Sequence, residues 1–185
     1  MAASDPSIAL AHWRAVREML FRTHPQSPVP TAARTHFRAR HFDHDPRLRF
    51  TLELRSATPP DAGALPLGLP NSGADTLAFT RLGIVVVPFP DGERELSVFW
   101  MAGYAGGLFL PFRDATNGQE TYPAGRYLLD TAKGADLGTD ARGHLVLDFN
   151  FAYQPSCAFD PRWACPLPPP ENRLDLPVRA GERIA

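Results

Sequence analysis

Apolar residues recur at intervals of three and four near the start of the chain. The series is Ala9, Trp13, Val16, Leu20 and Thr23. Such spacing is typical of an amphipathic α-helix. Ser4 or Asp5 can cap its first turn, Pro6 fits the first helical position, and Pro25 ends the pattern. We therefore expect a helix over residues 6–23, held on another surface by Trp13 and Leu20, with its charged side chains in solvent.

Further along, the period changes to two. Residues 48–55 alternate strictly between apolar and polar, which predicts a half-buried strand. Residues 77–87 and 93–102 flank a turn with Asp91-Gly92 at its tip and predict a hairpin. Shorter strands are expected at residues 108–112, 126–130 and 144–150. The pattern predicts a mainly β (α+β) fold, an antiparallel barrel-like or sandwich sheet with the N-terminal helix packed on it.

Proline- and glycine-rich segments separate these elements. Residues 24–46 and 56–76 show no sustained period and are expected to be a linker and a long loop, and residues 103–107 a bend. Residues 153–172 contain six prolines, so we expect an ordered loop there. With 185 residues, the chain is predicted to form a single domain with a β-rich core over residues 47–185.

The charge and the hydrophobicity of the chain argue against two kinds of partner, nucleic acids and membranes. The net charge is −1, with nine Arg against five acidic residues in residues 1–55, interleaved rather than gathered in one basic run. We therefore expect no nucleic-acid partner. No apolar run is long enough to cross a bilayer, and residues 1–5 lack the features of a secretory signal, so we expect no membrane partner and a cytoplasmic location.

Three histidines, His36, His41 and His44, lie close together in the sequence. A metal site needs neutral imidazoles that converge on the ion, usually with a fourth ligand. Pro46 and the lack of a helical period argue against such convergence, so we expect no metal site here.

Alternate residues of a strand point to opposite faces. In the strand expected at 144–150, Asp148 and Asn150 therefore share a face, and in the strand expected at 126–130, Arg126 and Asp130 share a face. If the two strands pair, Arg126 can form a charge-assisted hydrogen bond with Asp148. This pair could form a polar floor that binds a ligand's carboxylate, phosphate or hydroxyl. Alternatively, it could be a buried ion pair that fixes strand register, and we favour this second interpretation. Likewise, Asp114 could be an acid or base, but its place in a tight turn favours turn chemistry.

Cys157 and Cys165 are the only cysteines. Packed thiols, a structural or redox-labile disulfide, a metal-binding pair and a catalytic thiol all remain open. The spacing differs from that of redox and zinc motifs, and a reducing compartment favours thiols.

Several blocks in the last third of the chain are dense in aromatic, charged and turn-forming residues. They read FRDATNGQETY at 112–122, GRYL at 125–128, LDFNFAY at 147–153, Cys157, CPLPPPEN at 165–172 and AGE at 180–182. Over residues 108–184 the chain resembles the bacterial and archaeal family catalogued as domain of unknown function 1684. The resemblance implies a small soluble domain and supplies no catalytic residue or cofactor. Residues 56–76 are longer and richer in proline and glycine than this family leads us to expect.

Our first functional hypothesis is a binding module that holds a small polar or amphipathic ligand at the mouth of a β-barrel-like domain. The candidate ligand-binding residues are Asp114, Thr116, Tyr122, Arg126, Asp148, Asn150, Tyr153 and Asn172. The second is an enzyme, a hydrolase or isomerase that uses Asp114 or Asp148 as acid or base. The third is a structural or interaction protein with no small-molecule site.

Overall fold

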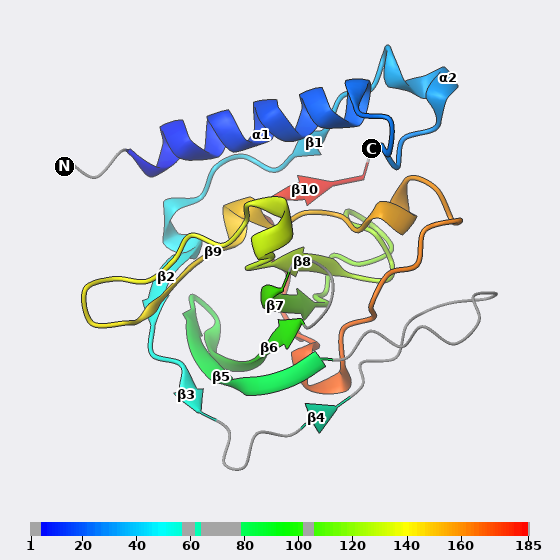
Figure 1. The fold of residues 1–185 in the computed structure, drawn as a ribbon. Helices are drawn as coiled ribbons and strands as arrows, with labels where there is room; N and C mark the ends of the chain where they lie inside the picture. The colour runs from blue at the N-terminus through cyan, green and yellow to red at the C-terminus, as the bar shows by residue number, and fades with distance from the viewer. Residues whose placement is uncertain (1–4, 57–61, 64–78, 102–105, 185) are drawn as a thin grey trace.

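A computed structural model of the chain describes residues 5–56, 62–63, 79–101 and 106–184 (Figure 1). Most of the loop expected at 56–76, much of the bend at 103–107 and the candidate cap Ser4 lie outside these residues. The helix α1 (Pro6–Thr23) lies along one side of the molecule, with the chain's C-terminal end beneath it (Figure 1). None of the described helices is both long and apolar enough to span a membrane.

Helix α1 has the predicted bounds but buries a different face. The Asp5 carboxylate accepts from the Ser7 N–H at 2.9 Å and caps the first turn. The buried residues are Leu10, Arg17 and Phe21, whereas Leu20 is 43% exposed. The prediction that Leu20 anchors the helix and that Arg17 faces solvent is therefore wrong. The buried carboxylate of Glu182, near the C-terminal end of the chain, compensates the charge of Arg17. This face of the helix can therefore pack inward.

The largest sheet has six antiparallel strands, in the order β3-β5-β6-β7-β8 with β4 also paired to β5. Their bounds are β3 (Arg55–Ser56), β4 (Ala62–Gly63), β5 (Phe79–Phe89), β6 (Gly92–Met101), β7 (Gly107–Phe112) and β8 (Arg126–Leu128). The predicted hairpin is confirmed as β5 and β6, which turn at Pro90-Asp91. Gly92 follows with φ +116°, a conformation that favours glycine.

Two smaller antiparallel pairs complete the β structure. They are β2 (Arg49–Leu52) with β9 (Leu145–Asp148), and β1 (Arg40–His41) with β10 (Glu182–Arg183). The mainly β fold with one packed N-terminal helix is confirmed, and it is sandwich-like; the described strands do not close into a barrel. The single strand expected at 48–55 is divided between the 3₁₀ turn η1 (Pro46–Leu48), β2 and β3.

Short helices occupy several segments expected to be irregular. They are α2 (Thr31–Arg34), η2 (Thr131–Lys133), η4 (Ser156–Ala158) and η5 (Pro170–Asn172). The strand expected at residues 144–150 is shorter than predicted, because its last residues belong to the short helix η3 (Phe149–Phe151). The segment expected to be a linker, residues 24–46, thus includes α2 and the strand β1.

The conditional pairing of residues 126–130 with residues 144–150 does not occur. Strand β8 pairs with β7, which places Arg126 opposite Phe112. Strand β9 pairs with β2, which places Asp148 opposite Arg49. Each charged residue has found a different partner, because strand neighbours are chosen by the whole sheet rather than by one complementary pair.

The core contains two apolar clusters. The larger joins the β5–β6 hairpin to residues 145–152 and 174–180. The smaller is mainly aromatic and includes Phe109, Tyr127, Tyr153 and Cys165. Trp13 of α1 packs against both clusters, so the helix covers the boundary between them.

Candidate functional site

The eight residues predicted to bind a ligand do not form one site. All are buried except Tyr122, which is half-buried. Seven of them are distributed over separate hydrogen-bonded groups centred on Arg126, Asp148, Asn172 and Tyr153. The eighth, Tyr122, donates its hydroxyl to the Cys157 carbonyl at 3.4 Å. Their neighbours show what each group can do.

The Arg126 cluster consists of Arg126, Asp114 and Thr116. Arg126 is 0% exposed, and its Nη2 donates to Asp114 Oδ2 at 2.6 Å and to the Val178 carbonyl at 2.7 Å. Its Nη1 donates to the carbonyls of Ala180 and Glu182. The other carboxylate oxygen of Asp114 accepts from the backbone N–H and the hydroxyl of Thr116. Burial lowers the pKa of Arg126, and the Asp114 charge opposes that shift. The charged groups of the cluster thus form hydrogen bonds with other groups of the protein.

The C-terminal tail, residues 176–184, supplies the carbonyls for this cluster and a carboxylate for α1. Glu182 accepts from Arg17 Nε at 2.5 Å and from the Gln154 N–H at 2.8 Å. Gly181 has φ +77°, and a Cβ there would lie 2.3 Å from the Ala152 carbonyl oxygen, so only glycine allows this close approach. Residues 180–182, with the sequence AGE, therefore connect the C-terminal tail to helix α1, to Arg126 of strand β8 and to the loop at Gln154.

Sequence reasoning missed Arg17 and Glu182 as partners. One signal was available: Leu10, Trp13, Arg17 and Phe21 also follow helical spacing, with the arginine inside an apolar stripe. An arginine in such a position needs a buried anion, which local sequence does not identify.

The Asp148 group fixes the β9–η3 corner. Asp148 Oδ2 accepts from Arg49 Nη1 at 2.9 Å, and Oδ1 accepts from the Asn150 N–H at 2.9 Å. The Asn150 amide exchanges hydrogen bonds with the backbone of Asp45 at 2.9 and 2.8 Å. Asn172 acts similarly elsewhere, since its amide bonds both backbone groups of Ser97 and the carbonyl of Pro111. Both groups connect strands to neighbouring segments.

A groove of about 720 Å³ lies between α1 and residues 155–166. Its apolar walls include Val16 and Leu20 from the helix and Trp163 from the opposite segment. Its floor includes Tyr127 and Tyr153. Leu20 is 43% and Trp163 39% exposed, so large apolar side chains meet solvent on both walls.

The polar groups of the groove floor are mostly bonded within the protein. Tyr127 and Tyr153 exchange backbone hydrogen bonds at 2.9 and 3.1 Å. The Tyr127 hydroxyl donates to the Pro166 carbonyl at 2.5 Å, and the Tyr153 hydroxyl donates to Asp130 Oδ2. Burial raises the pKa of Asp130 and that of Tyr153. Arg17 stacks 4.4 Å from the Tyr153 ring centroid and is paired with Glu182. The polar groups of the floor are thus largely occupied by partners within the protein.

Cys157 and Cys165 are unbridged thiols beside this floor. The Cys157 N–H donates to Cys165 Sγ at 3.2 Å. Cys157 is half-buried, and Cys165 is buried and lines the groove. A hydrogen bond from the Cys165 side chain lowers the pKa of Cys157 to about 7, and the pKa of Cys165 is raised.

The three histidines lie in different environments. His36 and His44 are exposed, and His41 is half-buried in β1. Within the described ranges, no three His, Cys, Asp or Glu side chains are arranged to hold a metal ion.

Comparison with known proteins extends the resemblance seen in the sequence. A solution NMR structure of the uncharacterized protein from gene locus rrnAC0354 of Haloarcula marismortui has a TM-score of 0.66 and 32% sequence identity. The match covers 96% of this chain and 94% of that one. No curated protein shows significant similarity to the chain. The family model described as "Protein of unknown function (DUF1684)" matches residues 35–183, so the chain belongs to the DUF1684 family.

Proposed function

We propose that this protein binds a small amphipathic ligand in the groove between α1 and residues 155–166. The observation that carries the proposal is the pair of walls, on which Leu20 and Trp163 expose apolar surface toward a hollow with an aromatic floor. Ligand sites are mostly apolar hollows of roughly 300–1,000 Å³ with a few polar groups, and about 720 Å³ lies within that range.

The polar lining supports an amphipathic rather than a purely apolar ligand. His24, Gln26 and Lys133 line the groove together with the apolar walls. A ligand with an apolar body against Trp163 and a polar end toward these groups would match both surfaces. Among the residues predicted from sequence to bind a ligand, Tyr153 lines the groove.

The remaining predicted residues have a different role in this proposal. Asp114, Arg126, Asp148 and Asn172 position the strands and the tail on which the groove rests, because their charged and amide groups bond to protein partners. The same bonds favour a structural role for Asp114 and Asp148 over acid or base chemistry. We propose a cytoplasmic location, where two neighbouring thiols remain reduced.

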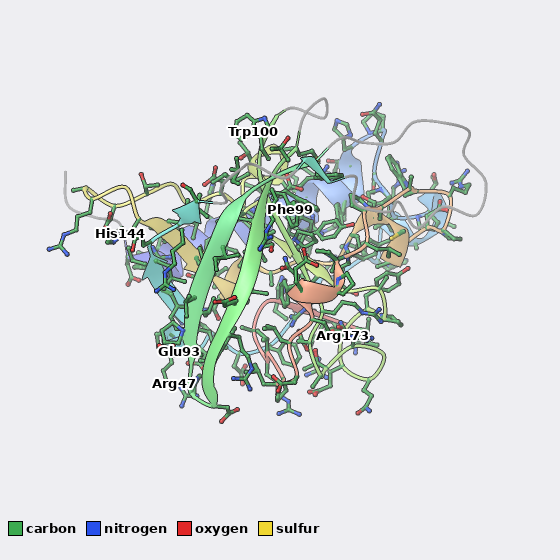
Figure 2. The ribbon with its side chains drawn as sticks, turned by 90° about the horizontal axis from the view of Figure 1, so that it is seen from below. Arg47, Glu93, Phe99, Trp100, His144 and Arg173 are labelled. Carbon is green, nitrogen blue, oxygen red and sulfur yellow. The ribbon has the colours of Figure 1, made fainter. Side chains whose placement is uncertain are left out.

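The test uses anilinonaphthalene sulfonate, a fluorescent amphipathic probe, with the folded full-length protein. We expect saturable binding of one probe per chain, weakened at least about tenfold by Trp163→Ser, since loss of a large apolar contact is worth on the order of 1.5–3 kcal/mol. Trp100→Ser is the matched control. Trp100 is 45% exposed and lies at the end of the β5–β6 hairpin opposite the turn near Glu93 (Figure 2).

Equal affinity in the Trp163→Ser, Trp100→Ser and unaltered proteins would remove the groove as the binding site. Mass spectrometry of the protein as purified then offers a second measurement. A retained small molecule that is lost in Trp163→Ser but kept in Trp100→Ser supports the proposal.

A further inference from the structure

We infer that Cys157 and Cys165 form a thiol–disulfide exchange site, in which Cys157 attacks a low-molecular-weight disulfide and Cys165 resolves the mixed disulfide. This activity goes beyond ligand binding in the groove and does not depend on it. The geometry begins with the 3.2 Å hydrogen bond from the Cys157 N–H to Cys165 Sγ, which places one thiol directly against the backbone of the other cysteine.

The segment between the two cysteines is held in place without a bridge between them. Cys157 is the central residue of the turn η4, and the Asp160 N–H donates to the Ser156 carbonyl at 3.2 Å. At the other end, the Tyr127 hydroxyl donates to the carbonyl of Pro166 at 2.5 Å. A disulfide forms without large backbone movement where the Cα atoms of the two cysteines lie within about 7 Å of each other. Thiol–disulfide exchange requires this anchored segment to accept such a bridge.

The two thiols differ in the way that attack and resolution require. Cys157 is half-buried, whereas Cys165 is 5% exposed and lines the groove floor. The attacking sulfur must be a thiolate, and Cys157 has a pKa of about 7 because the Cys165 side chain donates to it. Tyr122 and Tyr127 are further titratable groups near the pair in the described structure; both are neutral near pH 7, and burial raises the pKa of each.

The exchange balances without a metal or bound cofactor. The Cys157 thiolate bonds to one sulfur of the substrate disulfide R–S–S–R, and the first thiolate RS⁻ leaves and takes a proton from water. Cys165 then gives its proton to solvent and attacks Cys157 Sγ, which expels the second RS⁻. One substrate disulfide is reduced to two thiols, and the two protein thiols are oxidised to one disulfide.

The test treats the full-length protein with dithiobis(nitrobenzoate), an aromatic disulfide, and follows released thiolate and protein mass. The unaltered chain should release two thiolates and end two hydrogen atoms lighter, without an adduct. Cys165→Ser should release one thiolate and retain the adduct on Cys157. Cys157→Ser should react at least about tenfold more slowly, because its remaining thiol, Cys165, is buried and poorly accessible to the reagent.

An unaltered protein that carries two adducts and no internal disulfide would overturn the inference, and so would a Cys157→Ser protein that reacts at the original rate. Circular dichroism checks that each variant is folded, and Cys165→Ala replaces Cys165→Ser if the latter unfolds. The mass of the unaltered protein decides the matter without any variant. Probe binding in the groove is measured separately, so failure of one proposal leaves the other intact.

Discussion

The Arg126 cluster and the groove are both built from side chains typical of binding sites, but they differ in what those side chains contact. Arg126 is fully buried, and each of its terminal nitrogens donates to protein oxygens. In the groove, the floor is bonded internally while the walls present Leu20 and Trp163 to solvent. Chemical type alone therefore does not identify a ligand site, and our proposal for the groove is based instead on the exposed apolar surface of its walls.

The cluster also explains why the densest sequence blocks lie far apart in the chain. Residues 112–122, 125–128 and 180–182 meet at Arg126, where three tail carbonyls and one carboxylate surround a single guanidinium. Such a cluster ties the C-terminal tail to the sheet. The groove depends on this arrangement because the same tail holds α1 through Arg17 and Glu182.

The largest effect is expected from Arg126→Met. The substitution leaves the Asp114 charge and three carbonyls buried without their donor, so the free energy of unfolding should fall by about 3–5 kcal/mol. Urea unfolding measures this loss. The control is Arg179→Met, since Arg179 forms an exposed ion pair with Glu120 and its loss should lower the free energy of unfolding much less. If Arg126→Met and Arg179→Met lower the free energy of unfolding by similar amounts, the buried cluster does not contribute more to stability than an exposed ion pair.

The next effect separates Arg17 from the other arginines of α1. Arg17→Met should lower the free energy of unfolding by about 2–3 kcal/mol, because Glu182 is 1% exposed and would lose its buried partner. Arg22→Met changes an exposed residue on the same helix and is the control. If both variants unfold at the same urea concentration, the ion pair does not anchor the helix.

A pH dependence should appear at His41, which lies in β1 opposite Glu182. Burial, together with a smaller contribution from the charge of Arg14, lowers the pKa of His41 to about 4, whereas the unfolded value is 6.5. The folded state therefore binds this proton less readily. The stability that neutral His41 contributes is fully present above pH 6.5 and is lost as the pH falls toward 4. Partial exposure limits the loss to about 1–2 kcal/mol.

Unfolding measured between pH 7 and pH 4 in His41→Leu and His44→Gln tests this assignment. The His41→Leu protein should lose less stability with acid than the unaltered chain, and His44→Gln, which alters an exposed histidine, should follow the unaltered chain. Identical pH profiles for all three would contradict it.

The smallest effect on stability is expected in the groove. Leu20→Gln should change the free energy of unfolding by less than about 0.5 kcal/mol, because Leu20 is 43% exposed, while probe binding weakens. Leu10→Gln on the same helix alters a residue that is 3% exposed and should cost about 2–5 kcal/mol. A large loss of stability in Leu20→Gln would show that this wall is part of the core rather than an open surface.

Local periodicity was sufficient for the long helix and the long hairpin. The bounds of α1 and the hairpin of β5 and β6 follow from spacing, caps and a turn, which involve neighbours in sequence. The inward face of α1 was not predictable in the same way. Two stripes shared Trp13, and the choice between them depended on Glu182, which lies 165 residues away.

The candidate site shows the same limit. Sequence blocks correctly marked where polar residues concentrate, but Arg126 and Asp148 took different partners, Asp114 and Arg49. The groove was outside the prediction except for Tyr153, Cys165 and the surrounding proline-rich segment, because its walls come from residues 13–28 and 155–166.

The sequence by itself determined the family, the mainly β class, the N-terminal helix and the polar blocks, since these depend on composition and on short-range spacing. Only the tertiary structure decided which charges are buried together, which face of α1 points inward and where apolar surface remains open. Those outcomes depend on contacts between distant segments, and the free energy of burying a charged or apolar group is set by the partner it meets there.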